Sequence, residues 1–313
     1  MININAKIEY GGESLTSQKR TMYFLMTLLV FAWGLEYVFV KDALTVLDPL
    51  TLLFYKYCIG FLTVLVIKLK TEGKSLIHKK DIPLFLLCAI FGEIGYFFFE
   101  YSAMDYLPVS LITIILAFVP ALSIIVESVL YKKKVTKVLW IGILACAFGV
   151  ILIIGVDYHL LFEGRIIGYF LAFGAVVAWN LYNFVTASLH TKYESATLTL
   201  NQILCTVLLI SPYAIANTPA AEQITPSIIG GMLYLGIISS GICFMISVKS
   251  IHILGPTPTA MFSNFLPITS TFFGWLFLKE AISVMQIIGG TIVIAAGYIV
   301  IKEKGRVEES THD

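Results

Sequence analysis

Three glutamates and one lysine, all ionisable side chains, lie within stretches that are otherwise apolar. Glu93 and Glu100 fall in the run FGEIGYFFFE, Glu36 in FAWGLEYVFV and Lys56 in TLLFYKYC. An ionisable side chain inside a membrane costs roughly 3 kcal/mol on insertion scales and normally faces a cavity or a partner. These side chains therefore predict a polar interior rather than contact with lipid.

Lys56 is the one basic residue expected deep within an apolar stretch, at a depth similar to that of Glu36 and Glu100. One interpretation is a structural ion pair between Lys56 and either glutamate. The other is a functional role, as an outer gate or as a contact to a substrate. The sequence leaves both interpretations open.

Glu93 has no basic residue at its expected depth. Positions seven apart share a helical face, so Glu93, Tyr96 and Glu100 are expected to point the same way. Burial without a cation favours the protonated form of a carboxyl group. Glu93 is therefore either a substrate or proton site in a cavity, or a neutral acid hydrogen-bonded between helices. The first alternative makes a coupling proton a predicted partner.

The second half of the chain carries uncharged polar groups where the first half carries charges. Hydrogen bonds between helices are the simpler interpretation of such residues in a membrane. Together with the acidic first half, they also predict a pocket for a zwitterionic or amine-bearing cationic small molecule, with Tyr96 available for cation–π contact. The candidate residues in this half are Trp179, Tyr182, Asn183 and Asn264.

Ten apolar blocks of roughly 17 to 24 residues must position these groups, and each is long enough to cross a bilayer as a helix. Of the 313 residues, 58% are hydrophobic and 13% are charged, well below the charged fraction of soluble domains. The sequence predicts an all-α integral membrane protein with ten transmembrane helices. The blocks are 21–40, 50–67, 82–104, 108–130, 138–156, 166–188, 196–215, 227–248, 257–278 and 283–301.

The distribution of basic residues predicts the orientation. If the N-terminus is cytoplasmic, 17 of the 21 Lys and Arg residues lie on the cytoplasmic side, against three in outer loops and Lys56 within a span. This bias favours cytoplasmic tails at 1–20 and 302–313 in a multi-pass protein of the plasma membrane. No segment is large enough for a nucleic-acid-binding domain. The five cysteines, all inside apolar blocks without paired spacing, predict neither disulfides nor a metal site.

The two halves of the chain resemble each other at an offset of about 147 residues. Pro120 and Pro267 correspond, and AWGLEYVFVKDAL matches AWNLYNFVTASL. Each half, at 21–156 and 166–301, has five spans, so the two copies enter the bilayer in opposite senses as an inverted repeat. Matched prolines kink helices and point to a binding region, although a purely architectural kink is the alternative.

A second set of matched residues, the pairs Gly142/Gly149 and Gly290/Gly297, lies in blocks five and ten. Small residues at this spacing allow helices to approach closely. We expect them to serve helix packing, and a homodimer contact is the alternative use of the same surface.

Several motifs are similar to those of the EamA-type branch of the drug/metabolite transporter superfamily. They are FAWGLEYVFVKDAL, DPLTLLFYKY and the matched segments LPVSLITIILAFVPALSIIVESVLYKKKVT and LGPTPTAMFSNFLPITSTFFGWLFLKEAIS. The resemblance implies a central cavity lined by helices one to four and six to nine, with helices five and ten at the periphery. Lys56 stands where this family often has arginine, which weakens the case for two-pronged recognition of a carboxylate.

This resemblance implies a secondary transporter that moves small polar metabolites, amino acid-like or amine-like, by alternating access, with a leaning toward efflux. The sequence contains no GxxxxGK[ST] loop, HExxH or GxSxG motif, so we expect neither direct use of ATP nor an enzyme, and no cofactor. The alternative function is a channel or lipid-moving protein with a structural polar core. Substrate identity stays open among amino acids, amines, organic acids and drugs.

Overall fold

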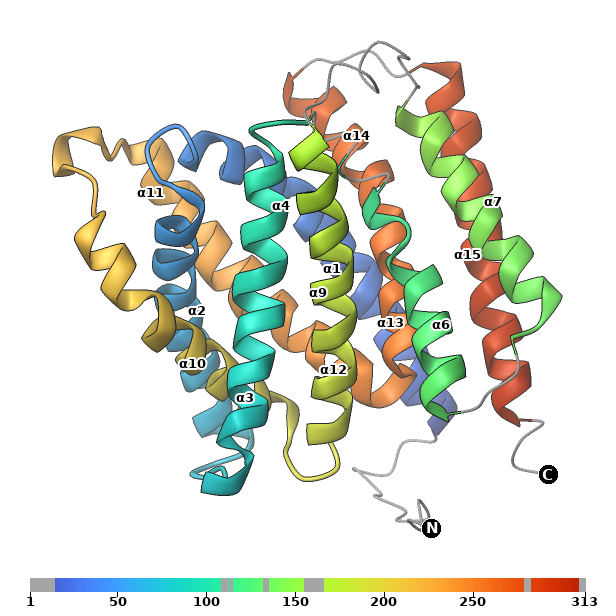
Figure 1. Ribbon diagram of the computed structural model, residues 1–313, viewed down its shortest axis with the longest axis horizontal. Coiled ribbons are helices and arrows are strands. Elements are labelled where there is room, and N and C mark those ends of the chain that lie inside the picture. Colours follow the sequence, from blue (N-terminus) through green and yellow to red (C-terminus); the bar gives the residue numbers. More distant parts are fainter. Residues whose placement is uncertain are drawn as a thin grey trace.

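The computed structural model of the chain describes residues 15–107, 112, 115–131, 135–154, 166–278 and 283–309. Within these ranges the chain is helical and contains no β-strand. Residues 1–14 and 310–313 of the expected tails lie outside the described residues. Figure 1 shows a bundle of helices that run between two ends. We call the end where α3 begins at Ile82 the lower end, and the end where α4 stops at Ala103 the upper end.

The described residues of the first half form five helical units, of which the first three are long and apolar enough to cross a membrane and the last two are shorter. The third unit is continuous from Lys79 to Ala103, although its hydrogen-bonding pattern changes along its length. Residues 108–111, at the start of the expected fourth block, lie outside the described residues. The elements are α1 (Leu15–Ala43), α2 (Pro49–Thr71), η1 (Lys79–Asp81), α3 (Ile82–Cys88), η2 (Ala89–Tyr96), α4 (Phe97–Ala103), α6 (Val119–Tyr131) and α7 (Lys137–Ile154).

The second half repeats this order upside down. Figure 1 shows that α1 starts at the lower end whereas α9 starts at the upper end, as an inverted repeat requires. The predicted architecture of ten helices in two inverted five-helix repeats is confirmed. The elements are α9 (Ile166–Leu189), α10 (Ser195–Ala216), η3 (Ala221–Gln223), α11 (Pro226–Leu233), η4 (Tyr234–Cys243), α12 (Phe244–Leu254), α13 (Pro256–Met261), η5 (Phe262–Phe265), α14 (Leu266–Leu278) and α15 (Val284–Glu309).

Corresponding helices of the two repeats contain matching π-helical segments, η2 and η4. A π-segment inserts extra backbone into a helix and is common at functional sites. The two segments carry glycines at their closest approaches to other helices. A Cβ atom on Gly92 of η2 would collide with the ring of Tyr182, and one on Gly236 of η4 would collide with Ile59. The glycines therefore let these segments pack directly against their neighbours.

Both matched prolines lie at the beginning of a helix rather than in the middle of one. Pro120 is the second residue of α6, and Pro267 is the second residue of α14. Proline suits the first turn because its missing N–H has no intrahelical acceptor there. The expected ninth block is accordingly divided into α13, the 3-10 turn η5 and α14. The interruption places irregular backbone beside the centre of the bundle.

Helices α7 and α15 pack against each other at one edge of the bundle (Figure 1). A Cβ atom on Gly149 would lie 2.8 Å from the carbonyl oxygen of Gly289, and one on Gly142 would collide with Val300. The first glycine pair therefore serves helix packing within the chain. Large apolar side chains on the outside of the bundle, such as Ile141 and Phe170, are exposed as a lipid-facing surface requires.

The helices α2 and α10 occupy equivalent places in the two repeats but begin with different caps. Asp48 caps α2 from within its own repeat, accepting from the backbone N–H groups of Leu50 and Thr51 at 3.0 and 3.1 Å. The N-terminus of α10 is capped by Glu72 of the first repeat, which accepts from the N–H groups of Ala196 and Thr197, each at 2.7 Å. The lower end is therefore tied together across the repeats.

A second contact across the repeats lies beside this cap. Asp81 accepts hydrogen bonds from Lys192 at 2.8 Å and from the hydroxyl of Tyr193 at 2.6 Å. Tyr193 in turn accepts from the backbone N–H of His78 at 2.9 Å. At the upper end, the described residues of the two repeats are joined by single exposed hydrogen bonds, such as Tyr55 to Thr218 at 3.1 Å. In the described conformation, the two repeats are therefore joined more strongly at the lower end than at the upper end.

Candidate substrate pocket

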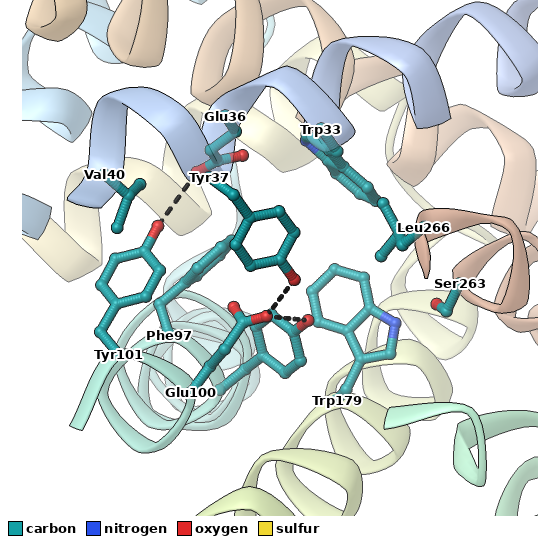
Figure 2. Close-up of a pocket in the computed structure, with 11 residues that line it drawn as sticks. Trp33, Glu36, Tyr37, Val40, Phe97, Glu100, Tyr101, Trp179, Ser263 and Leu266 are labelled. Carbon is teal, nitrogen blue, oxygen red and sulfur yellow. Dashed lines mark hydrogen bonds between the residues drawn. The ribbon is translucent and has the colours of Figure 1, made fainter. Parts of the chain in front are cut away.

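A pocket opens in the upper half of the bundle between the two repeats. It contains about 420 Å³ of empty space, counting the part that is open to the outside. One face of α1 supplies residues at helical spacing of three and four, which is why they point together. The lining residues are Trp33, Glu36, Tyr37 and Val40 of α1, Tyr96, Phe97, Glu100 and Tyr101 of η2 and α4, Trp179 of α9, and Ser263 and Leu266 beside η5 (Figure 2).

The carboxylate of Glu36 is paired with a positive charge that lies behind the pocket wall. Its Oε1 atom lies 3.0 Å from the ammonium nitrogen of Lys56 and accepts from the hydroxyl of Tyr101, also at 3.0 Å. Ser239 of the second repeat donates to its other oxygen. Lys56 is fully buried, and its nitrogen lies 3.8 Å from the centre of the Phe97 ring. The positive charge of Lys56 and the negative charge of Glu36 therefore compensate each other.

Glu100 is held by neutral groups instead. Its Oε1 atom accepts from the hydroxyl of Tyr37 at 2.7 Å and from that of Tyr96 at 3.3 Å. No ion pair reaches Glu100 from the part of the chain that the structure describes. Figure 2 shows the hydroxyl of Tyr37 pointing toward this carboxylate. When Glu100 is ionised, it gives the pocket a net negative charge, because the charges of Glu36 and Lys56 cancel.

Aromatic rings form the rest of the wall around Glu100. The ring of Tyr96 lies 4.6 Å from that of Trp179, and Trp33 lies 6.1 Å from Trp179 in an edge-on arrangement. Figure 2 shows Trp33 and Trp179 on one side of the pocket and Tyr101 on the other. Aromatic faces beside a carboxylate are suited to an ammonium group, which gains from both the charge and the ring quadrupoles.

The structure divides the sequence-predicted site residues into three groups. Glu36, Tyr96, Glu100 and Trp179 line the pocket, and Lys56 supports it from behind. Asn264 is buried near the pocket wall in η5 but is not among the lining residues. The remaining three, Glu93, Tyr182 and Asn183, are buried outside the lining and belong to the neighbouring layer of the bundle.

Sequence reasoning missed several lining residues, of which Trp33 and Tyr37 matter most. The signal was available, because Trp33, Tyr37 and Val40 lie on the same helical face as Glu36. The involvement of Tyr101 could have been inferred in the same way, because it follows Phe97 by four residues and shares its helical face. Leu266 depends on the break in the ninth helix, for which the local sequence offers only Pro267 as a hint.

No group of three or more His, Cys, Asp or Glu side chains that could hold a metal ion occurs among the described residues. The model of the EamA-like transporter family matches residues 20–155 and 166–302 of the chain, one match in each half. The chain belongs to the EamA-like transporter family. Its function is therefore in membrane transport, and it is a multi-pass membrane protein.

Relatives of this EamA-like protein span nearly its whole length. A protein of Archaeoglobus fulgidus described as an uncharacterized transporter is 23% identical, over 90% of this chain and 99% of the relative. The uncharacterized transporter YoaV of Bacillus subtilis is 20% identical, over 83% of this chain and 90% of its own. Protein PecM of Dickeya dadantii is 24% identical, over 75% of this chain and 81% of PecM.

A solved crystal structure has the same fold as this EamA-like chain. It superposes with a TM-score of 0.72 at 17% sequence identity, and the match covers 90% of this chain and 98% of the other. At this identity the likeness concerns the fold alone. It supports the helix arrangement of the two repeats, whereas the chemistry of the pocket rests on the residues of this chain.

Proposed function

We propose that this EamA-like protein is a secondary active transporter of small amine-bearing metabolites, either simple amines or amino acids. The observation that carries the proposal is the position of Glu100, a carboxylate without an ion pair among the described residues, in an aromatic pocket. An ammonium group placed between Glu100 and Trp179 would gain charge pairing and cation–π contact in a site largely removed from water.

The same pocket is unfavourable for a dicarboxylate. Among the described residues, its lining includes no lysine or arginine, and the ammonium of Lys56 is already bonded to Glu36 and Tyr101. A second anion beside Glu100 would add like-charge repulsion in a region of low dielectric constant. An amino acid fits only if its carboxylate points toward the open side of the pocket, so amines are expected to bind at least as well as amino acids.

We further propose that transport occurs by alternating access, in the direction of efflux, across the plasma membrane with both tails cytoplasmic. Inverted repeats allow one half to rock against the other around a central site. The contacts of Glu72 and Asp81 at the lower end support a conformation that is open toward the upper end. The excess of basic residues in segments at the lower end supports its assignment to the cytoplasm.

The experiment uses purified protein in two steps. A thermal-shift screen compares simple amines, neutral amino acids and dicarboxylates, since a ligand at about 100 times its Kd stabilises the folded state by about 2.7 kcal/mol. Counterflow in proteoliposomes then tests the amines that bind. We expect stabilisation and saturable counterflow with amines, lost in Glu100→Gln and retained in Glu303→Gln, a control at the far end of α15.

Two outcomes would contradict the proposal. Preferential stabilisation and transport of dicarboxylates would exclude the assigned substrate class. Flux of an amine without counterflow would exclude a carrier and would support the alternative of a channel.

A further inference from the structure

Glu93 is the most isolated ionisable group among the described residues. Its side chain is fully buried, and neither carboxyl oxygen has a hydrogen-bond partner. Its electrostatic partners are Tyr57 of α2, Cys88 of α3, Tyr182 of α9 and Cys205 of α10, none of which carries a positive charge. The nearest glutamate along the chain, Glu100, is engaged by Tyr37 and Tyr96 in the pocket.

A layer of aromatic rings extends from the pocket to the surroundings of Glu93. Trp179 faces the pocket, and its ring lies 4.6 Å from Tyr96 and 5.2 Å from Tyr182. The ring of Tyr182 rests directly on the backbone at Gly92, next to Glu93. A substrate in the pocket therefore contacts Trp179 and Tyr96, whereas Glu93 is not among the residues that line the pocket.

A chain of polar groups leads from this layer toward the lower end, and we call it the polar strip. The hydroxyl of Tyr182 donates to Gln202 at 3.4 Å, and the amide of Gln202 donates to the hydroxyl of Thr186 at 3.0 Å. The thiol of Cys88 lies 3.6 Å from the same hydroxyl. Because Thr186 follows Tyr182 by one helical turn on α9, the strip descends along that helix toward its end at Leu189.

We propose that Glu93 is a proton-binding site, separate from the substrate pocket and reached along the polar strip from the lower end. An ionised carboxylate without any donor or cation is costly in such surroundings, so the closed conformation holds the neutral acid. Opening of the lower end brings water to the strip. As the O–H bond of Glu93 breaks, its proton passes to that water and leaves along the strip as hydrated H⁺, while the ionised carboxylate accepts hydrogen bonds from the remaining water.

The consequence for transport is that one proton can be exchanged on the side opposite to the pocket opening. The substrate and the proton occupy different sites, yet the two are connected by the contact between Trp179, which lines the pocket, and Tyr182, which packs on Gly92 beside Glu93. The role in coupling rests on the proposed transport function, whereas proton binding itself does not. The test therefore begins without any substrate.

Infrared spectroscopy of the purified protein at neutral pH reports protonated carboxyl groups through their C=O stretch. We expect a band of a protonated, weakly hydrogen-bonded acid that is absent in Glu93→Gln, shifted in Glu93→Asp and unchanged in Glu100→Gln. The aspartate variant keeps a carboxyl group, and size-exclusion profiles of all variants establish that they are folded. A wild-type spectrum without this band, or a band that persists in Glu93→Gln, would overturn the proposal.

The route is tested by transferring the same samples into heavy water and following the shift of the band. Removal of one link of the strip in Gln202→Leu is expected to slow the exchange about tenfold, as for the loss of one or two hydrogen bonds. The matched variant on the pocket side, Tyr37→Phe, should leave the exchange rate unchanged. Slower exchange in Tyr37→Phe with a normal rate in Gln202→Leu would mean that the proton arrives through the pocket, and would refute the assigned route.

Discussion

The ammonium nitrogen of Lys56 lies 3.0 Å from Oε1 of Glu36, and both side chains are buried. A buried pair is strongly coupled to folding, because removing one partner leaves the other charge without compensation. The pair joins α1 to α2, and Ser239 extends the network to the second repeat. This network therefore connects the pocket wall to α2, the helix that packs against α10.

Lys56→Met is expected to destabilise the protein by about 3–5 kcal/mol, the range found when one partner of a buried pair is removed. The double variant with Glu36→Gln should recover most of this loss, since no unpaired charge then remains. Thermal unfolding in detergent measures both. A Lys56→Met protein as stable as the wild type would show that the pair contributes nothing to folding.

Substitution of Gly92 should be harmful for a steric reason. A Cβ atom at this position would collide with the ring of Tyr182, so Gly92→Ala is expected to cost about 1–3 kcal/mol through overpacking. Gly230 in α11 is the matched control, because a Cβ atom there would meet nothing within 4 Å among the described residues. Gly230→Ala should be neutral or stabilising by up to about 1 kcal/mol, because alanine favours helices. Equal effects of the two substitutions would rule out the contact with Tyr182 as the cause.

The cap that Glu72 provides for α10 predicts an effect on both stability and access. Glu72→Ala should cost about 0.5–2 kcal/mol, as the loss of a helix cap does, and should loosen the lower end. Native Cys88, which is fully buried near that end, then becomes reactive toward a maleimide, as measured by peptide mass spectrometry.

The matched control for this variant is Asp48→Ala, which removes the equivalent cap at the upper end. It should lower stability by a similar amount without increasing the labelling of Cys88. If Cys88 reacted equally in the two variants, the labelling would reflect general loosening rather than opening at the lower end.

A pH effect follows from His190, which lies just beyond α9. Burial and the neighbouring ring of His252, 5.0 Å away, lower the pKa of His190 to about 4. Its Nε2 atom lies 2.8 Å from the carbonyl oxygen of Val248. Below about pH 6.5, His190 takes up a proton in the unfolded chain but stays neutral in the folded protein until the pH approaches 4. The free energy of unfolding is therefore highest above about pH 6.5 and falls toward pH 4.

The loss of stability attributable to His190 is at most about 3 kcal/mol, from the difference between the two pKa values. Melting temperatures of the wild type and His190→Gln between pH 7 and 4 measure it as a difference, since carboxylates such as Asp81 titrate in both proteins. Curves that remain parallel over this range would contradict the predicted role of His190.

The helical fold was readable from the sequence because length and hydrophobicity alone define a membrane-crossing segment. Glu36 and Glu100 could also be placed at a similar depth from their positions within blocks. The sequence could not predict which glutamate pairs with Lys56. Either glutamate was expected at a similar depth, and the choice depends on how α1, α2 and α4 pack. The same holds for Glu93, whose distance from the pocket is set by the ring of Tyr182.

The break at η5 lies beside Pro267, where the sequence predicts a kink, whereas the π-helical segments were not predicted. Their cause is tertiary, since Gly92 and Gly236 are ordinary helix residues until another helix approaches them. The cap of α10 is similar, because Glu72 lies 124 and 125 residues from the N–H groups that it accepts from. Contacts at such separation leave no periodic pattern in the sequence.

This long-range cap has a consequence for biosynthesis. Glu72 has already left the ribosome when residues 196 and 197 are made. The first repeat, which is synthesised earlier, therefore supplies the carboxylate that caps a helix of the second repeat. The cap on the first turn of α10, the second helix of the second repeat, is completed only when that repeat docks onto the first. A second repeat made without the first would therefore leave the N–H groups of residues 196 and 197 without this acceptor.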